Sequence, residues 1–298
     1  MTNKDYRCGL VAIVGRPNVG KSTLMNHLLG QKISITSRKP QTTRHRILGI
    51  HTDKKAQSIF LDTPGIHSNA KKTLNKYLNR AASDALFGVD VIVVVVEALT
   101  WTEEDQRVMD LAKKQEAPIL LALNKVDQIE EKNRLLEWIE QTVPVADVDE
   151  VIPLSALKEV NLDRLMVLVN QRLPIAPPMF PDDQITDRSS RFLASEIVRE
   201  KLTRRLGNEL PYAISVEIES YTEEENLVRI HALIWVERKS QKLIVVGNKG
   251  STLKAIGMDA RKDIERLIGC KVFLRTWVKV KESWSDDARQ LGQLGYDE

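Results

Sequence analysis

The sequence predicts a larger α/β domain, built on a mostly parallel sheet with helices on both faces, followed by a smaller α+β domain. Three observations lead to this fold class. Before the middle of the chain, short apolar runs alternate with helical patterns, which is typical of a parallel sheet flanked by helices. Residues 173–183 read LPIAPPMFPDD, and four prolines in eight positions exclude a helix or a central strand. Beyond them the order is helix, strand, strand, helix, helix, strand.

The proline-rich stretch sets the domain bounds. The larger domain is expected over residues 1–174, a stiff extended linker over 175–186, and the smaller domain with a C-terminal tail over 187–298. A long surface loop is the alternative interpretation of the prolines, but loops of this length are uncommon inside a domain. We also consider that ligand binding at the first domain reorients the second through this linker.

Each predicted strand of the larger domain corresponds to a short apolar run. The runs read GLVAIVG, AQSIFLDTPG, DVIVVVVEA, PILLALNK and VIPLSA. The third run is too short to span a bilayer and predicts a buried parallel strand. In the smaller domain we expect a helix over 187–206, strands in AISVEIES, LVRIHALIWVER and KVFLRTWVKVK, and a helix from Ser251 after a glycine turn.

Composition excludes several function classes. Of 298 residues, 42% are hydrophobic and 29% charged, as in ordinary globular proteins, and the net charge of +3 selects no partner. The two cysteines, Cys8 and Cys270, have no CxxC spacing, which argues against a zinc site or disulfide framework and fits a reducing compartment. The first ten residues lack an apolar signal segment, so we expect a cytoplasmic protein.

The first glycine turn, GRPNVGKS, matches the phosphate-binding loop G-x-x-x-x-G-K-[ST]. A strand precedes the loop and a helix follows it, so backbone N–H groups can converge on phosphate oxygens. Lys21 should reach the β- and γ-phosphates, and Ser22 should bind Mg²⁺. The predicted nucleotide-binding residues here are Gly15, Arg16, Pro17, Asn18, Val19, Gly20, Lys21 and Ser22.

Two further motifs end later strands and specify the nucleotide. In DTPG, Asp62 can hold Mg²⁺ and the Gly65 N–H can sense the γ-phosphate. In NKVD, Asp127 can accept two hydrogen bonds from guanine N1 and N2, a donor pair that adenine lacks, which predicts GTP and GDP as ligands. The predicted contacts are Asp62, Thr63, Pro64, Gly65 and Ile66, with Asn124 bracing the phosphate loop, Lys125 along the base, Asp127, and a backbone N–H of Ser155 or Ala156 on guanine O6.

The basic segment QKISITSRKPQTTRHR lies between the first two motifs and is the loop expected to close over the γ-phosphate. Thr42 or Thr43 would supply the metal ligand, and related TTR loops favour Thr43. The predicted metal ligands are therefore Ser22, Thr43 and Asp62.

Ile66 occupies the position where Ras-like GTPases carry a water-orienting glutamine. An isoleucine cannot orient water, so either hydrolysis is weak or another group stabilises the transition state. Asn18 is a candidate, because its side chain could help hold K⁺ between the phosphates; its alternative role is to shape the loop. The predicted catalytic residues are Lys21, Thr43, Gly65 and Asn18.

The second glycine turn, GNKG, lacks the Lys-Ser pair and matches the G-x-x-G loop of a KH domain, which clamps about four single-stranded nucleotides. Its α-β-β-α-α-β surroundings match the type II KH order. Residues 238–281 contain twelve basic and three acidic residues, a net charge of +9, which favours a phosphate backbone. The predicted RNA contacts are Gly247, Asn248, Lys249, Gly250 and Lys254, above an apolar floor of Ile244, Val246, Leu253 and Ile256. Phe273 and Trp277 are expected in the core rather than on a stacking surface.

The chain resembles the Era family of bacterial GTPases from end to end. The resemblance rests on GRPNVGKSTL, QKISITSRKPQTTRHR, DTPGIH, NKVD, TDRSSRFLASEIVREKL, VVGNKG and WVKVKESWSDD. It implies a monomeric GTPase that binds the 3′ end of 16S ribosomal RNA and assists its maturation and assembly of the 30S subunit, with a fraction peripherally on the inner membrane. A hydrophobic residue at the position of Ile66 also fits this family.

Two other functions are alternatives: an RNA-binding module and a membrane-signalling GTPase. A pure RNA-binding module would use the nucleotide only as a switch ligand, and Ile66 is compatible with that. A membrane-signalling GTPase would need a lipidation motif or a long amphipathic anchor, and the sequence has neither.

Overall fold

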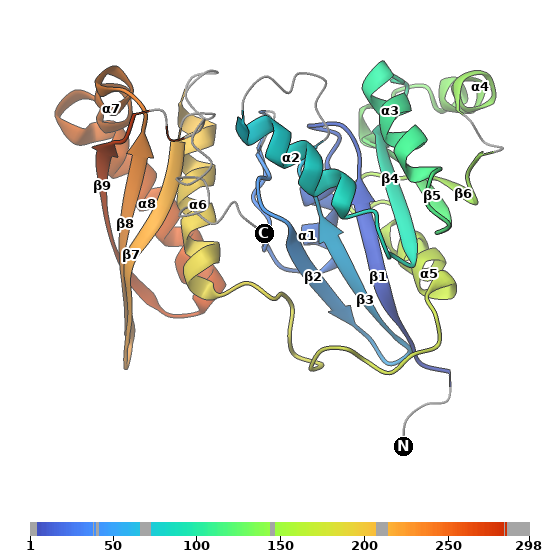
Figure 1. Cartoon of the computed structure of the whole chain (residues 1–298), viewed down its shortest axis with the longest axis horizontal. Helices are drawn as coiled ribbons and strands as arrows, with labels where there is room; N and C mark the ends of the chain where they lie inside the picture. Colours follow the sequence, from blue (N-terminus) through green and yellow to red (C-terminus); the bar gives the residue numbers. More distant parts are fainter. Residues whose placement is uncertain are drawn as a thin grey trace. The chain divides into compact units, whose positions relative to one another are not determined.

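The computed structural model describes residues 5–37, 39, 42–65, 73–143, 147–206, 214–282 and 284, with backbone alone at 73–76 and 132. The chain divides into two compact units (Figure 1). The first comprises Met1–Ser34, Thr43–Ala70 and Tyr77–Asp187, and the second comprises Ile35–Thr42, Lys71–Lys76 and Arg188–Glu298. The predicted bounds 1–174, 175–186 and 187–298 stay predictions.

The first unit is an α/β domain around a six-stranded sheet of order β2-β3-β1-β4-β5-β6. All neighbouring pairs are parallel except β2 with β3, so the predicted mostly parallel sheet is confirmed. β4 is buried on both faces, as its unbroken run of valine and isoleucine predicts. The strands are β1 (Arg7–Val14), β2 (Ile47–Thr52), β3 (Ala56–Asp62), β4 (Val91–Glu97), β5 (Ile119–Asn124) and β6 (Glu150–Pro153).

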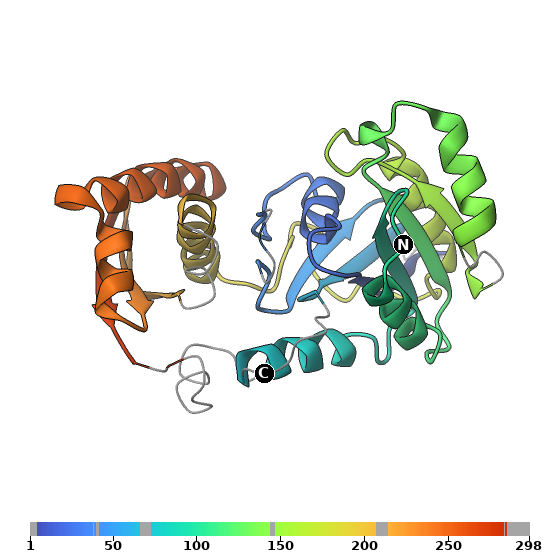
Figure 2. The same cartoon turned by 90° about the horizontal axis from the view of Figure 1, so that it is seen from above.

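Helices cover both faces of this sheet. Figures 1 and 2 show α1 and α5 on one face and α3 and α4 on the other. The carboxyl ends of the parallel strands therefore meet at one edge, where ligands bind in such sheets. The helices are α1 (Lys21–Leu28), α2 (Thr73–Asp84), α3 (Glu103–Ala112), α4 (Lys132–Thr142) and α5 (Leu162–Arg172), with a short 3₁₀ turn at Val126–Gln128.

Strand β2 was not predicted from the sequence. It pairs antiparallel with β3 through a hairpin, where Oδ1 of Asp53 accepts hydrogen bonds from the N–H groups of Lys55 and Ala56. Its apolar run, ILGI, is only four residues long and follows a polar loop, so it gives a weak periodic signal.

The proline-rich stretch lies along the first unit rather than spanning free space. The N–H of Cys8 donates to the carbonyl of Pro174, and the N–H of Ile50 donates to the carbonyl of Ile185. Buried Gln57 bonds the backbone of Met179 and Phe180 from its side-chain amide. Residues 174–186 therefore form a strap fixed to this unit.

The second unit is an α+β domain whose three-stranded sheet has the order β7-β8-β9, with β8 antiparallel to β7 and parallel to β9. Three helices cover one face and enclose its apolar core. The α-β-β-α-α-β order predicted for a type II KH domain is present. Its elements are α6 (Ser190–Arg205), β7 (Ile214–Glu224), β8 (Leu227–Val236), α7 (Lys239–Val246), a 3₁₀ turn at Asn248–Gly250, α8 (Ser251–Ile268) and β9 (Lys271–Val280).

Two predictions about this unit are wrong. Ile256 is fully buried in the core between α8 and the sheet, so it cannot form a floor for bases. Phe273 and Trp277 lie on the sheet face opposite the helices and not in the core, with Phe273 46% exposed and Trp277 half-buried, because β9 places odd-numbered side chains outward.

Candidate functional site

The phosphate-binding loop joins β1 to α1 and is braced by the end of β5. Nδ2 of Asn124 donates to the carbonyl oxygen of Val19 at 2.7 Å. Gly20 has φ +106°, and a Cβ at this residue would lie 2.3 Å from that same Nδ2. Only glycine permits this approach. Gly20 therefore allows Asn124 to lie against the phosphate loop and hold it.

Lys21 lies at the centre of the loop with 6% of its surface exposed. Its Nζ donates to the carbonyl oxygens of Gly15 at 2.9 Å and Arg16 at 3.0 Å. Burial lowers the pKa of Lys21 to about 8, although the nearby Asp62 raises it. A buried ammonium at this point would be stabilised by a phosphate anion.

Three side chains predicted to bind a metal converge beside Lys21. Oγ of Ser22 lies 2.8 Å from Oγ1 of Thr43 and donates to Oδ2 of Asp62 at 2.8 Å. Burial raises the pKa of Asp62, and its Oδ1 is buried with no hydrogen-bond partner among the described residues. An orphaned carboxylate oxygen beside two hydroxyls fits Mg²⁺, which prefers oxygen ligands.

Of the two threonines left open by the sequence, the structure places Thr43 beside Ser22. Oγ1 of Thr42 donates instead to the carbonyl of Lys39 at 2.6 Å, away from Ser22.

Ser34 is a residue of this site that the sequence did not reveal. Its Oγ donates to Oδ2 of Asp62 at 2.5 Å, and Oδ1 of Asn26 accepts from its N–H. Asn26 thus fixes the start of the predicted closing loop from helix α1. A single serine in a polar loop carries no sequence signal, so only the fold brings it to the carboxylate.

The predicted guanine-binding residues gather at the ends of β5 and β6. Oγ of Ser155 donates to Oδ1 of Asp127 at 2.5 Å, which orients the carboxylate. The N–H of Ala156 donates to Oδ1 of Asn124 at 2.9 Å, so in this structure it serves the brace rather than facing a base.

Glu97 links the phosphate loop to the NKVD motif and was also missed. Its Oε2 lies 3.3 Å from Nη2 of Arg16 and 2.7 Å from Nζ of Lys125. Burial raises the pKa of Glu97, but Lys125 and Arg16 outweigh burial and lower it overall. An acid at the carboxyl end of β4 was the available signal, because ligands bind at that edge.

The rest of the DTPG motif is buried, whereas Asn18 of the phosphate loop is exposed. Oγ1 of Thr63 donates to the carbonyl of Ile13 at 3.1 Å, and Pro64 and Gly65 are buried beside it. Asn18 is exposed with φ +65°, which fits its loop-shaping role. Ile66 lies outside the described residues.

The GNKG turn joins α7 to α8 in a conformation that its glycines permit. Gly247 and Gly250 have φ of +73° and +81°, and a Cβ on Gly247 would lie 2.2 Å from Oγ1 of Thr252. Asn248, Lys249 and Lys254 are exposed around it. On α7, Leu243 is 74% and Ile244 52% exposed, which leaves an apolar surface next to the loop.

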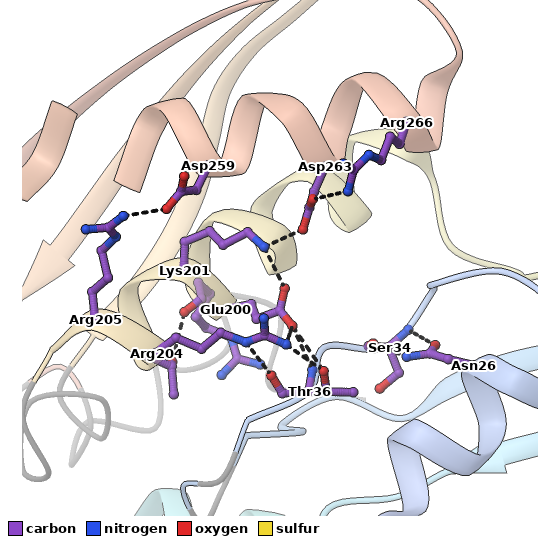
Figure 3. A network of polar contacts seen from close by, with 12 residues as sticks. Asn26, Ser34, Thr36, Glu200, Lys201, Arg204, Arg205, Asp259, Asp263 and Arg266 are labelled. Atoms are coloured by element: carbon purple, nitrogen blue, oxygen red, sulfur yellow. Dashed lines mark hydrogen bonds and ion pairs between the residues drawn. The ribbon is translucent and has the colours of Figure 1, made fainter. Parts of the chain in front are cut away.

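Thr36 and Thr42, within the predicted closing loop, belong to the second unit and bond to α6 (Figure 3). Oε1 of Glu200 accepts from the N–H and Oγ1 of Thr36 at 3.1 and 3.2 Å. Nη2 of Arg204 donates to Thr36 Oγ1, and Nη2 of Arg199 donates to the carbonyl of Thr42 at 2.6 Å. The residue after Thr42 is the predicted metal ligand Thr43.

Comparisons with known proteins agree with both motif sets. Residues 10–125 match the model of the 50S ribosome-binding GTPase family, and residues 209–285 match the KH domain model. The chain is 58% identical to GTPase Era of Pseudomonas aeruginosa over 293 residues, 97% of this chain and 95% of that protein. It is 56% identical to GTPase Era of Azotobacter vinelandii over 300 residues, 99% of each.

The chain belongs to the Era family of GTPases.

Solved Era structures share the complete fold. One, with 39% identity and a TM-score of 0.94 over 98% of this chain and 99% of that one, is Era in complex with MgGDPNP and nucleotides 1506–1542 of 16S ribosomal RNA. Another, also at 39% and 0.94 over 97% and 99%, is an Aquifex aeolicus Era variant bound to GDP and AlF₄⁻. The predicted resemblance is thus confirmed, and the chain is a GTPase with a C-terminal KH domain.

Proposed function

We propose that this GTPase uses its cycle to time its grip on the 3′ end of 16S ribosomal RNA, and so assists maturation of that RNA and assembly of the 30S subunit. One observation carries the proposal. The same chain has a site where the predicted GTP-binding side chains lie close together and a GNKG loop with exposed lysines. A similar Era structure contains a GTP analogue and this part of 16S RNA.

The residues of the GTP site divide into those that bind phosphate, guanine and metal. The Lys21 ammonium offsets charge on the β- and γ-phosphates, and the Gly65 N–H donates to the γ-phosphate. Asp127 accepts from guanine, oriented by Ser155. Ser22, Thr43 and Asp62 would hold Mg²⁺, which when bound neutralises charge developing on the phosphates.

Hydrolysis tests these assignments. With phosphate release as the readout, Ser22→Ala and Asp62→Asn should each lower Mg²⁺-dependent turnover by at least about 10². Ser240→Ala, an exposed serine of the second unit, is the control and should match the unchanged chain. Full turnover in both site variants would contradict the metal assignment.

We further propose that Asn18 helps hold K⁺ near the phosphates, where its charge would act as an arginine finger does. Asn18 is exposed in the phosphate loop with φ +65°. Turnover should be faster in KCl than in NaCl, and Asn18→Ala should remove the difference. Equal rates in the two salts would refute this role.

RNA binding is tested at the GNKG loop. Gly247→Ala should weaken binding of a 16S 3′-terminal oligonucleotide, because its Cβ would meet Thr252. Gly269→Ala is the matched control, since Gly269 also follows a helix with positive φ but has open space for a Cβ. Lys249→Ala should weaken binding and reduce its salt dependence by about one phosphate contact. Equal affinity in all three would argue against RNA binding at this loop.

We propose that the protein is a cytoplasmic monomer. A fraction of it would be held peripherally on the inner membrane by the basic residues of 238–281. Among the described residues, no helix is long and apolar enough to cross a membrane. Cell fractionation should find the protein mainly with the cytosol, and high salt should release any membrane-bound fraction. A fraction that resists salt would contradict peripheral attachment.

A further inference from the structure

The outer face of the KH-domain sheet carries alternating aromatic and basic side chains. On β9 the inward residues Val272, Leu274, Val278 and Val280 pack with the helices, so the odd-numbered residues point outward. Strands β8 and β9 run parallel in register, with Arg229 opposite Phe273 and Trp235 opposite Lys279. We call this surface the aromatic–basic face; its members are Arg229, His231, Trp235, Lys271, Phe273, Arg275, Trp277, Lys279 and Lys281.

Cations and rings on this face lie against one another. The guanidinium of Arg229 lies 5.5 Å from the centroid of the Phe273 ring. Lys279 and Lys281 place their ammonium groups 5.9 and 5.5 Å from the ring of Trp235. His231 and Trp277 meet edge to face with centroids 5.7 Å apart. The rings are thus spread along the two strands over about 20 Å, at roughly 3.3 Å per residue.

The charge of the face is uneven. Its described acidic partners lie on β7, where Glu224 pairs with Arg229 at 2.6 Å and Glu219 pairs with Lys279 at 3.4 Å. Lys271, Arg275 and Lys281, at the β9 side, have no ion pair among the described residues. A polyanion would therefore be attracted along β9 and repelled from β7.

Exposure makes the face available to a ligand. Phe273 keeps 46% of its surface exposed, and Trp235, Trp277 and His231 are half-buried. Among the described residues, the core helices α6, α7 and α8 all pack on the opposite face. Exposed rings beside unpaired cations are the combination by which proteins stack bases and hold phosphates of a single strand.

We propose that the aromatic–basic face binds unpaired RNA nucleotides, with bases stacked on Phe273, Trp277 and Trp235 and phosphates beside Lys271, Arg275 and Lys281. It is a second single-strand surface, separate from the GNKG loop. The two are connected through α7 and α8, which flank the loop and also contact β9. The proposal rests on the proposed RNA-binding function and extends the length of strand that the domain holds.

The test measures affinity for fluorescent single-stranded RNA from the 16S 3′ terminus, shortened stepwise from either end, on the full-length protein. Phe273→Leu removes the ring but keeps an apolar side chain, and should weaken binding of the longest RNA about tenfold. Phe273→Tyr keeps the ring and should bind normally. For the shortest RNA that still binds through GNKG, all variants should match the unchanged protein.

Phe87→Leu is the control, because Phe87 is 67% exposed in the first unit. It should bind RNA of every length normally. Equal affinity of Phe273→Leu and the unchanged protein at every length would overturn the proposal and leave the face to another partner, such as an acidic protein segment. If Gly247→Ala still weakens binding in that case, RNA binding at the GNKG loop stands and only the second surface fails.

Discussion

Buried polar atoms mark the nucleotide site at the scale of single residues. Lys21 and Asp62 are both buried. Burial lowers the pKa of Lys21 and raises the pKa of Asp62, so it favours the neutral form of each side chain. Burying such groups is costly unless a ligand compensates them. Triphosphate and Mg²⁺ would supply that compensation, so the site is shaped for ligands that stabilise both charges.

Asp127 is expected to select guanine. Asp127→Asn replaces one acceptor oxygen by a donor, and should weaken GTP binding by at least about 10² while favouring xanthosine triphosphate. Ser155→Ala, which removes only the hydroxyl that orients Asp127, should give a smaller loss without a change of base. Competition binding with the two nucleotides measures both. An unchanged guanine preference in Asp127→Asn would overturn the assignment.

Gly20 is expected to tolerate no side chain. A Cβ would lie 2.3 Å from Asn124, so Gly20→Ala should displace the brace and lower GTP affinity by about tenfold or more. Gly30→Ala is the control: it also has positive φ, but nothing lies within 4 Å of its Cβ. Isothermal titration with GDP should show a loss only in Gly20→Ala. Equal losses in both would point to general backbone strain instead.

At the scale of elements, a capping box starts α3 and serves the site as well. Oγ1 of Thr102 accepts from the N–H of Asp105, while Oδ2 of Asp105 accepts from the Thr102 N–H and from Arg16 of the phosphate loop. Thr102→Ala should cost about 1 kcal/mol of unfolding free energy, and Thr102→Ser should cost little. Urea unfolding measures both, and equal stability of the two variants would contradict the cap.

The strap depends on one buried amide. Gln57 is fully buried and bonds the backbone of Met179 and Phe180. Gln57→Ala would leave those groups unsatisfied, at about 1–3 kcal/mol, and should make residues 174–186 sensitive to limited proteolysis. Gln184→Ala changes a less buried position in the strap, so the protease should cut this variant as slowly as the unchanged protein. Protection in both variants would mean that the strap is held by other contacts.

Sequence predicted the elements that have strong local signals and missed those that depend on distant partners. The unbroken valine run of β4 and the glycine turns are readable because burial and backbone geometry leave direct marks. β2, Ser34 and Glu97 depend on what the fold brings beside them, and a short run or a lone polar residue does not show that. Phe273 was misassigned because a strand's two faces cannot be told apart until the helices are placed.

At the scale of the whole molecule, the closing loop carries residues that bond within each of the two units. Thr36 and Thr42 bond to α6 of the KH unit, while Ser34 and Thr43 belong to the GTPase unit and bond to Asp62 and Ser22. A nucleotide that repositions Thr43 would act on the segment that Glu200 and Arg199 hold. This gives coupling a route other than the strap, whose bonds fix it to the first unit.

The most direct test measures the affinity of the full-length protein for the 16S 3′-terminal RNA with GDP and with a non-hydrolysable GTP analogue. We expect a difference of about fivefold or more, which should shrink in Glu200→Gln because an uncharged amide accepts more weakly from Thr36 and no longer pairs with Arg204. Ser240→Ala should keep the full difference. The same RNA affinity with both nucleotides in the unchanged protein would contradict the claim that GTP times the grip on RNA.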